Sequence, residues 1–429
     1  MSEPSDPPRS PSPRPGLLAR GAGKLGGLAS QAMRLYAQAN ALAADGMAAE
    51  AEAAYRRTLG LNPRFAEAHN NLGNVLRALG RAEEAVAAYR EALACGLDHP
   101  LVHYNLASAL KAAGDPAPAE RHFRRALVEE PAYAEAFNNL ANLLRDGDRL
   151  TDSATAYRRA LAVRPDWDEA HDNLSGALYL LHEEGRHEEA ARFARLWLRD
   201  HPGHPVARHI GAAVAGLDAG ERASDAYVRQ VFDLFAGEFD DKLLGELGYR
   251  APSLLAEALA DAGIAPDGTL DVLDAGCGTG LCGPFLRGLA RRLAGVDLSP
   301  GMLERAAGRG LYDALEEAEL GAFLEARPEA FDLIAAADVL CYFGALDGVL
   351  ARAAAALRPG GRLAFTVERL GEGGVPWRVG PHGRYAHTES HVRDRLAAAG
   401  LSVLRLAPDT LRHESGEPVA GLVVLAARP

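Results

Sequence analysis

VLDAGCGTG, residues Val272 to Gly280, is the stretch that decides the fold of the C-terminal half of the chain. Its first residues predict a buried strand that delivers Asp274. Gly276, Gly278 and Gly280 then predict a tight turn before a helix. Glycine is needed where a ligand approaches the backbone closely, because a Cβ atom would block the approach. The stretch therefore predicts a cofactor-binding loop at the end of a strand.

Two kinds of cofactor fit such a loop. Gly278, Gly280 and Gly283 satisfy the GxGxxG pattern of dinucleotide-binding domains, and Asp297 would then bond to a ribose hydroxyl. That pattern is weak when it stands alone, so a dehydrogenase stays as an alternative. Three features favour S-adenosylmethionine instead. Asp274 precedes the glycines, the glycines begin directly at the strand end, and no substrate domain fits in the residues that follow.

Strands and helices alternate on both sides of the loop. Strands are predicted over residues 269–276, 293–299, 331–340 and 362–368, and helices over 283–292, 300–309 and 348–361. Such alternation predicts a parallel sheet covered by helices on both faces. The end of the chain differs, because the helix predicted over 391–400 is followed by two strands with no helix between them. Their connection allows an antiparallel final strand.

Four pieces follow one another in this half: DAGCGTG, VDLSPGML, FDLIAAADVL and LRPGGRLAFTVE. Together they resemble the class I S-adenosylmethionine-dependent methyltransferase family, over about residues 225–429. The resemblance implies an α/β Rossmann-like fold with a mostly parallel seven-stranded sheet, and S-adenosyl-L-methionine as cofactor. It also implies a set of cofactor-binding residues: Asp274, Gly276, Cys277, Gly278, Gly280, Asp297, Leu298, Glu319 and Asp338.

By this resemblance, the glycines would pack against the methionine part of the cofactor. Asp274 would orient the loop through backbone amides or water. Asp297 would accept hydrogen bonds from both ribose hydroxyls, with Leu298 beside the adenine. Glu319 falls where the family often has an acid near the adenine amino group. Asp338, at the end of the fourth strand, falls where substrate and methyl group meet, or else it only caps the next turn.

Methyl transfer is an in-line displacement, so positioning supplies much of the rate, and a base is needed only for a protonated nucleophile. The candidates follow the fourth and fifth strands. Trp377, His382, Arg384, Tyr385 and His387 gather in the segment 369–390, which suggests a substrate lid. The alternative is a surface loop that ends in the N-cap of the next helix, Thr388. The candidate catalytic residues are His387, Tyr385 and Asp338.

The N-terminal half repeats itself. Aromatic residues recur every 34 positions, at Tyr55, Tyr89, Phe123 and Tyr157. A period of this length, with two helices in each unit, resembles the tetratricopeptide repeat family over about residues 32–204, as five repeats. We predict a disordered Pro/Ser/Arg tail over 1–30, an all-α solenoid with a capping helix over 31–220, and the methyltransferase domain over 221–429.

Four asparagines share one phase of the repeat: Asn71, Asn105, Asn139 and Asn173. If the first helices of the repeats line a concave surface, these amides form a ladder along it. An amide both donates and accepts, which suits an extended peptide, and the array looks like that of O-GlcNAc transferase. The ladder is therefore a candidate partner-binding site. Alternatively, the amides bond between neighbouring repeats.

The composition narrows the function classes. With 46 basic and 58 acidic residues the net charge is −12, so a nucleic-acid partner is not expected. No apolar run long enough for a membrane span and no signal segment is seen. The four cysteines lack metal-ligand spacing, so we expect no metal and a cytoplasmic location.

Two interpretations of the whole chain follow. The favoured one is an S-adenosylmethionine-dependent methyltransferase whose repeats recruit a partner or protein substrate. The alternative is a repeat-scaffold adaptor with a non-catalytic methyltransferase fold. The intact glycine loop favours the enzyme. The methyl acceptor cannot be read from the sequence.

Overall fold

The computed structural model describes residues 26–429 except 238, 242, 244, 246 and 415. The chain divides into two compact units, the first ending at Arg164 and the second beginning at Pro165. No helix in the described part of the chain is long and apolar enough to cross a membrane.

Residues 1–25 of the predicted disordered tail lie outside the described residues. Helix α1 begins at Gly26, so it includes residues 26–30 of the predicted tail. The packing of α1 starts at the buried Ala32. Extending a formed helix by a few residues costs far less than nucleating one, so the helix runs beyond its packed part.

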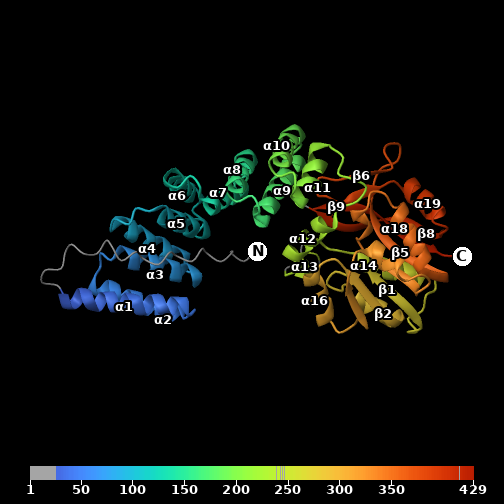
Figure 1. The fold of residues 1–429 in the computed structure, drawn as a ribbon, viewed down its shortest axis with the longest axis horizontal. Coiled ribbons are helices and arrows are strands. Elements are labelled where there is room, and N and C mark those ends of the chain that lie inside the picture. Colours follow the sequence, from blue (N-terminus) through green and yellow to red (C-terminus); the bar gives the residue numbers. More distant parts are fainter. Residues whose placement is uncertain (1–25, 238, 242, 244, 246, 415) are drawn as a thin grey trace. The chain divides into compact units, whose positions relative to one another are not determined.

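Consecutive pairs of helices make up the first unit (Figure 1). The pairs are α1 (Gly26–Ala44) with α2 (Ala48–Leu61), α3 (Ala66–Ala78) with α4 (Ala82–Ala94), α5 (Pro100–Ala112) with α6 (Pro116–Glu129), and α7 (Ala134–Asp146) with α8 (Leu150–Val163). The helical repeat region that the 34-residue period predicted is thereby confirmed.

A small residue and an aromatic residue lock the helices of a pair together. An ideal Cβ on Gly73 of α3 would lie 2.6 Å from the ring of Tyr89 on α4, so glycine is required there. The Tyr89 hydroxyl donates to Asn74 at 2.7 Å, and Tyr55 donates to Asn40 at 2.6 Å. The periodic aromatic therefore adds a partly buried hydrogen bond to its packing.

Three further helices open the second unit, and we call them the terminal repeat: α9 (Asp168–Glu183), α10 (His187–Asp200) and α11 (Pro205–Ala215). Helix α9 has 16 residues where α3 has 13, so the first helix of the fifth repeat is the longer one. Gly216 caps the C-terminus of helix α11, and its φ of +67° is typical of such a cap. It lies within the predicted capping helix.

Helices α12 (Asp225–Phe235), α13 (Phe239–Asp241) and α14 (Ala251–Asp261) lead into the α/β part. The strands are β1 (Leu270–Ala275), β2 (Ala290–Asp297), β3 (Ala314–Glu317), β4 (Phe331–Ala336), β5 (Leu357–Arg369), β6 (Trp377–Val379), β7 (Tyr385–His387), β8 (Ser402–Glu414) and β9 (Glu417–Ala427). The remaining helices are α15 (Gly283–Leu289), α16 (Pro300–Gly308), α17 (Leu320–Glu325), the short 3₁₀ helix η2 (Leu340–Tyr342), α18 (Asp347–Ala356) and α19 (Glu389–Ala398).

In the described residues the strands form a single sheet (Figure 1). The order β3-β2-β1-β4-β5 is parallel throughout, and β9 runs antiparallel to both β5 and β8. This run of seven strands confirms the predicted sheet and its antiparallel last strand. The short strands β6 and β7 were not predicted. They form a hairpin beside the end of β5, in the segment that we expected to be a loop.

Apolar residues of alternate strand positions form two cores, one on each face of the sheet. Helices α17, α18 and α19 cover one face through residues such as Phe323, Leu350 and Leu396. Helices α14 and α15 cover the other through Leu255 and Leu286. The carboxyl ends of the parallel strands are left at one edge, where ligands bind in sheets of this type.

Candidate functional site

The glycine loop between β1 and α15 has the backbone conformation that its sequence predicts. Gly276, Gly278 and Gly280 adopt positive φ angles of 64°, 52° and 86°. A Cβ on Gly276 would lie 2.5 Å from the side chain of Val339, whereas at Gly278 no atom lies within 4 Å of the ideal Cβ. The loop is thus packed from below at Gly276 and open at Gly278, where a ligand can reach the backbone.

Asp297, the last residue of β2, is bonded to this loop. Its carboxylate oxygens accept the backbone N–H of Gly278 at 2.8 Å and of Ser299 at 2.9 Å. Burial raises the pKa of Asp297, although the amides of Ser299 and Gly278 act against the rise. A further backbone bond, from Cys277 to the carbonyl of Val296 at 3.0 Å, joins loop and strand. The carboxylate therefore lies beside the open side of Gly278.

Asp274 lies beneath the loop at 1% exposure. Its carboxylate accepts the hydroxyl of Tyr312 at 2.6 Å, so the partner seen is a side chain rather than the loop amides. Burial raises the pKa of Asp274 to about 7, the Tyr312 bond lowers it, and the charge of Asp297 raises it further. Asp274 is therefore close to half-protonated at neutral pH.

A group of charged side chains occupies the carboxyl edge of β4, β5 and β8. We call it the carboxyl-edge cluster, and its members are Asp338, Glu368, His382, Arg384, Arg412 and Glu414. Asp338 follows β4 in a left-handed conformation, φ +53°, and the Thr366 hydroxyl on β5 donates to its carboxylate at 2.8 Å. Val339, next in the chain, is the residue that packs on Gly276.

Two guanidinium groups bind the three carboxylates of this cluster. Arg412, 3% exposed, donates to Asp338 and to Glu414 at 2.8 Å each. It also donates to Glu368. Arg384 donates to Glu368 at 2.7 Å and to Glu414. Charged groups this deeply buried are tolerated because each is paired and hydrogen-bonded.

Electrostatics set the charge state of the cluster. Burial pushes the pKa of Glu368 upward, but Arg384, His382 and Arg412 outweigh it and hold that pKa at about 2. Burial lowers the pKa of His382 to about 4, and Arg384 lowers it further. Near neutral pH Glu368 is therefore ionised, and His382 is neutral.

Two of the predicted cofactor contacts have partners of their own. Glu319 follows β3 as predicted, but its carboxylate accepts the Ala322 N–H at 2.7 Å, as the N-cap of α17. Its other oxygen accepts from Arg222 at 2.7 Å. Leu298 is half-buried, and its carbonyl accepts from Arg229 at 3.1 Å. Adenine contacts of Glu319 and Leu298 stay predictions.

The two catalytic candidates on β7 form hydrogen bonds to backbone carbonyls that lie outside the carboxyl-edge cluster. The Tyr385 hydroxyl donates to the carbonyl of Gly220 at 2.7 Å. The buried His387 ring bonds through Nε2 to the carbonyl of Gly344 at 3.2 Å, and burial lowers its pKa to about 4. Both groups thus hold backbone segments in place. Of the three candidates, Asp338 is the one that adjoins the glycine loop.

Two acidic side chains of the α12–α13 segment, which sequence analysis did not identify, contact the glycine loop and the residues next to β2. Asp240 accepts from Thr279 in the loop and from Arg309, which also donates to the Thr279 carbonyl at 2.6 Å. Asp233 accepts from the hydroxyl of Ser299. Only the position of acidic residues among the aromatic residues of this segment could have hinted at these contacts.

The asparagines predicted to bind a partner bond across the repeats. Asn71 donates to Tyr36 at 2.9 Å and to Asn40 at 3.1 Å. Asn139 donates to Tyr104 at 2.8 Å, and Asn105 donates to Asn70 at 3.4 Å. Each partner stands in the preceding repeat. Inter-repeat bonding, one of the two interpretations of the ladder, is therefore observed for these three residues; Asn173 also has partners.

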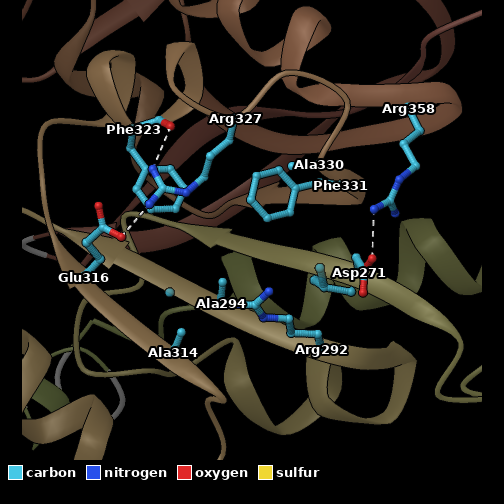
Figure 2. Close-up of a pocket in the computed structure, with 12 residues that line it drawn as sticks. Asp271, Arg292, Ala294, Ala314, Glu316, Phe323, Arg327, Ala330, Phe331 and Arg358 are labelled. Atoms are coloured by element: carbon cyan, nitrogen blue, oxygen red, sulfur yellow. Dashed lines mark hydrogen bonds and ion pairs between the residues drawn. The ribbon is translucent and has the colours of Figure 1, made fainter.

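A pocket of about 350 Å³ lies away from the glycine loop, toward the amino ends of β1 and β4 (Figure 2). Four of the charged side chains that line it form ion pairs with one another. Arg358 binds Asp271 at 2.9 Å, and Arg327 binds Glu316 at 2.7 Å while its guanidinium lies 3.8 Å from the centre of the Phe323 ring. The residues that line the pocket do not include the glycine loop.

Two groups of side chains among the described residues could hold a metal ion, both in the repeats. One consists of His69, Glu91 and Cys95, and the other of Asp98, His103 and Glu129. In the second group Arg125 already pairs with both carboxylates. Neither group lies near the glycine loop.

Each half of the chain matches known protein families. Residues 273–363 match the family described as "Methyltransferase domain", and residues 64–127 and 104–170 match tetratricopeptide repeat families. A human relative, methyltransferase-like protein 27, is 42% identical over 91 residues, which are 21% of this chain and 37% of the relative. The aligned part thus spans little more than a third of that protein.

Solved structures resemble each half separately. An S-adenosylmethionine-dependent methyltransferase from Mesorhizobium loti is 24% identical, over 40% of this chain and 98% of its own, with a TM-score of 0.32. YrrB, described as a TPR protein with an unusual peptide-binding site, is 22% identical, over 42% of this chain and 90% of its own, with a TM-score of 0.35.

The fold and the glycine loop define a methyltransferase-type α/β domain behind a helical repeat region. The family matches agree: the chain carries tetratricopeptide repeats over residues 64–170 and a methyltransferase domain over residues 273–363.

Proposed function

We propose that the chain is an active methyltransferase that binds S-adenosyl-L-methionine at the glycine loop. One observation carries the proposal: the open side of Gly278 adjoins the carboxylate of Asp297, which bonds to the Gly278 N–H at 2.8 Å. A backbone free of side chains and an acid for the ribose hydroxyls are what this cofactor needs. Val339 packs against Gly276, which brings the preceding residue, Asp338, next to the loop. Asp338 would therefore lie on the side of the cofactor where the methyl acceptor binds.

Replacing Asp297 with alanine is expected to weaken S-adenosylmethionine binding by about 10- to 100-fold, since losing a charge-assisted hydrogen bond costs about 1.5–3 kcal/mol. Isothermal calorimetry of the full chain measures this change. Asp261→Ala, which removes an exposed acid paired with Arg405, is the control and should bind like the wild type. No affinity in the wild type, or tighter binding of NAD, would contradict the proposal and favour the adaptor or the dehydrogenase.

The repeats are proposed to recruit a partner or protein substrate. An amide –NH₂ has two donor hydrogens and its oxygen accepts, so an asparagine can bond to the next repeat and still offer groups to a peptide. Asn71 uses both donors and its oxygen also accepts from Asn70. Asn139, half-buried, donates one side-chain hydrogen bond, to Tyr104. Asn139 is therefore the stronger peptide-binding candidate.

Asn139→Ala is expected to reduce the capture of proteins from a lysate at least several-fold, while Asn71→Ala leaves capture unchanged. Asn139→Ala loses one inter-repeat bond and Asn71→Ala loses two, and each lost bond should lower the free energy of unfolding by about 0.5–1.5 kcal/mol. Quantitative mass spectrometry of captured proteins and urea unfolding measure the two effects. Equal capture by both variants and the wild type would leave the ladder with its structural role alone.

A further inference from the structure

The β6–β7 hairpin is held from outside the α/β part by the terminal repeat. His209 of α11 bonds through Nε2 to the carbonyl of Gly383, in the turn of the hairpin, at 2.7 Å. These residues stand 174 positions apart. The ring of His209 also packs on Tyr385 of β7, with centroids 5.8 Å apart. The hairpin is thereby fixed to a helix of the repeat fold.

There is no free space in this joint. An ideal Cβ on Gly383 would lie 2.4 Å from the Tyr227 hydroxyl and 2.5 Å from Cδ1 of Ile210 on α11. The backbone of Gly383 is in the left-handed region, φ +83°. Glycine is therefore required twice over, for its conformation and for the contact with α11 and α12.

The residues on either side of Gly383 are members of the carboxyl-edge cluster. His382 lies 3.5 Å from Glu368, and Arg384 donates to the same carboxylate at 2.7 Å. The bond from His209 thus fixes the peptide that places both side chains. Helix α9 reaches the same turn, because the ring of Tyr179 lies 6.5 Å from that of His382.

We propose that the terminal repeat positions the acceptor side of the methyltransferase site. His209 of α11 fixes the peptide of Gly383, and this peptide positions the side chains of the neighbouring His382 and Arg384. Those two side chains in turn fix the positions of the Glu368 and Glu414 carboxylates at the carboxyl edge. That this side binds the methyl acceptor rests on the proposed function, whereas the link from α11 to the carboxyl-edge cluster does not. His209 and Gly383 are positioning residues in this scheme, and the cofactor loop is outside it.

Gly383→Ala in the full chain tests the link by hydrogen exchange with mass spectrometry. Exchange should accelerate at least tenfold in peptides covering 377–387 and 409–414, and stay unchanged in the loop 272–280. The matched control is Gly373→Ala, in the same segment. Gly373 also has a positive φ, +90°, but nothing lies within 4 Å of its ideal Cβ. It carries the same backbone strain without the steric clash, and should exchange like the wild type.

A second pair of variants covers the case in which Gly383→Ala does not fold. His209→Ala loses the donor to Gly383, and His209→Gln keeps an N–H donor, so exchange should rise in the first and return toward normal in the second. His187→Ala, an exposed histidine of the same repeat, is the control. Unchanged exchange at 377–387 in His209→Ala, or an equal rise at 272–280, would overturn the proposal.

Cofactor binding separates this proposal from the proposed function. Calorimetry with S-adenosylhomocysteine should give the same affinity for His209→Ala and the wild type, because the joint does not touch the glycine loop. If the wild type does not bind the probe, the proposed function fails while the exchange result still decides the mechanical link. If His209→Ala alone loses affinity, the joint supports the whole domain rather than the acceptor side.

Discussion

Replacing Arg412 with methionine is expected to lower the free energy of unfolding of the second unit by about 3–5 kcal/mol, the cost of breaking a buried ion pair by removing one partner. The side chain is 3% exposed and binds Asp338, Glu368 and Glu414. Without it, Arg384 alone would face three carboxylates in a region of low dielectric. Urea unfolding followed by circular dichroism measures the loss.

A matched control lies in the same strand. Arg405 of β8 is 36% exposed and pairs with Asp261, so Arg405→Met should cost at most about 1 kcal/mol. Adding Glu368→Gln to Arg412→Met should recover part of the loss, because it removes one uncompensated charge. An Arg412→Met protein as stable as Arg405→Met would show that the cluster is hydrated rather than buried.

Asp274→Asn is expected to stabilise the cofactor-free protein at pH 8 by up to about 4 kcal/mol, with little effect near pH 4. The pKa of Asp274 is about 7 in the folded chain against an ordinary value of 3.8. A raised pKa favours folding below the ordinary value, and this contribution is lost as pH rises through 7. Asparagine does not titrate, and its oxygen can still accept from Tyr312.

Unfolding in urea at pH 4, 6 and 8 measures this pH dependence. The difference between Asp274→Asn and the wild type should grow between pH 4 and pH 7 and then level off. Tyr312→Phe is the companion variant. The Tyr312 bond lowers the pKa of Asp274, so its loss should raise that pKa further. The stability difference should then continue to grow to a higher pH before it levels off. Parallel pH profiles for Asp274→Asn and the wild type would mean that Asp274 ionises normally.

The order of elements could be predicted from sequence because each depends on a local pattern. The 34-residue period gave the helix pairs, and the alternation of apolar strands with helices gave the seven-stranded sheet. Strands β6 and β7 escaped prediction because each has three residues, too few for a period. Their pairing is set instead by contacts with β5 and α11, which are distant in the chain.

Some residues of the candidate site could likewise be predicted from sequence, and others could not. The glycine loop and Asp297 could be read from sequence, since both stand at fixed places in one strand–turn–helix–strand unit. The carboxyl-edge cluster could not, because Arg412 and Glu368 meet only when β8 and β5 are brought to one edge. Tyr385 and His387 were chosen for their chemistry, but they bond to the carbonyls of Gly220 and Gly344, whereas Arg384 bonds to Glu368. Nothing local in the sequence records which face looks toward the site.

The bond between His209 and Gly383 also has a consequence for synthesis. Its two ends are made 174 residues apart, and a ribosome adds about 5–20 residues per second. His209 is therefore synthesised roughly 9–35 s before Gly383. During that interval α11 can pack on α9 and α10, but His209 has not yet met the carbonyl of Gly383. A nascent chain paused before residue 383 therefore holds a folded terminal repeat that still lacks its bond to the hairpin.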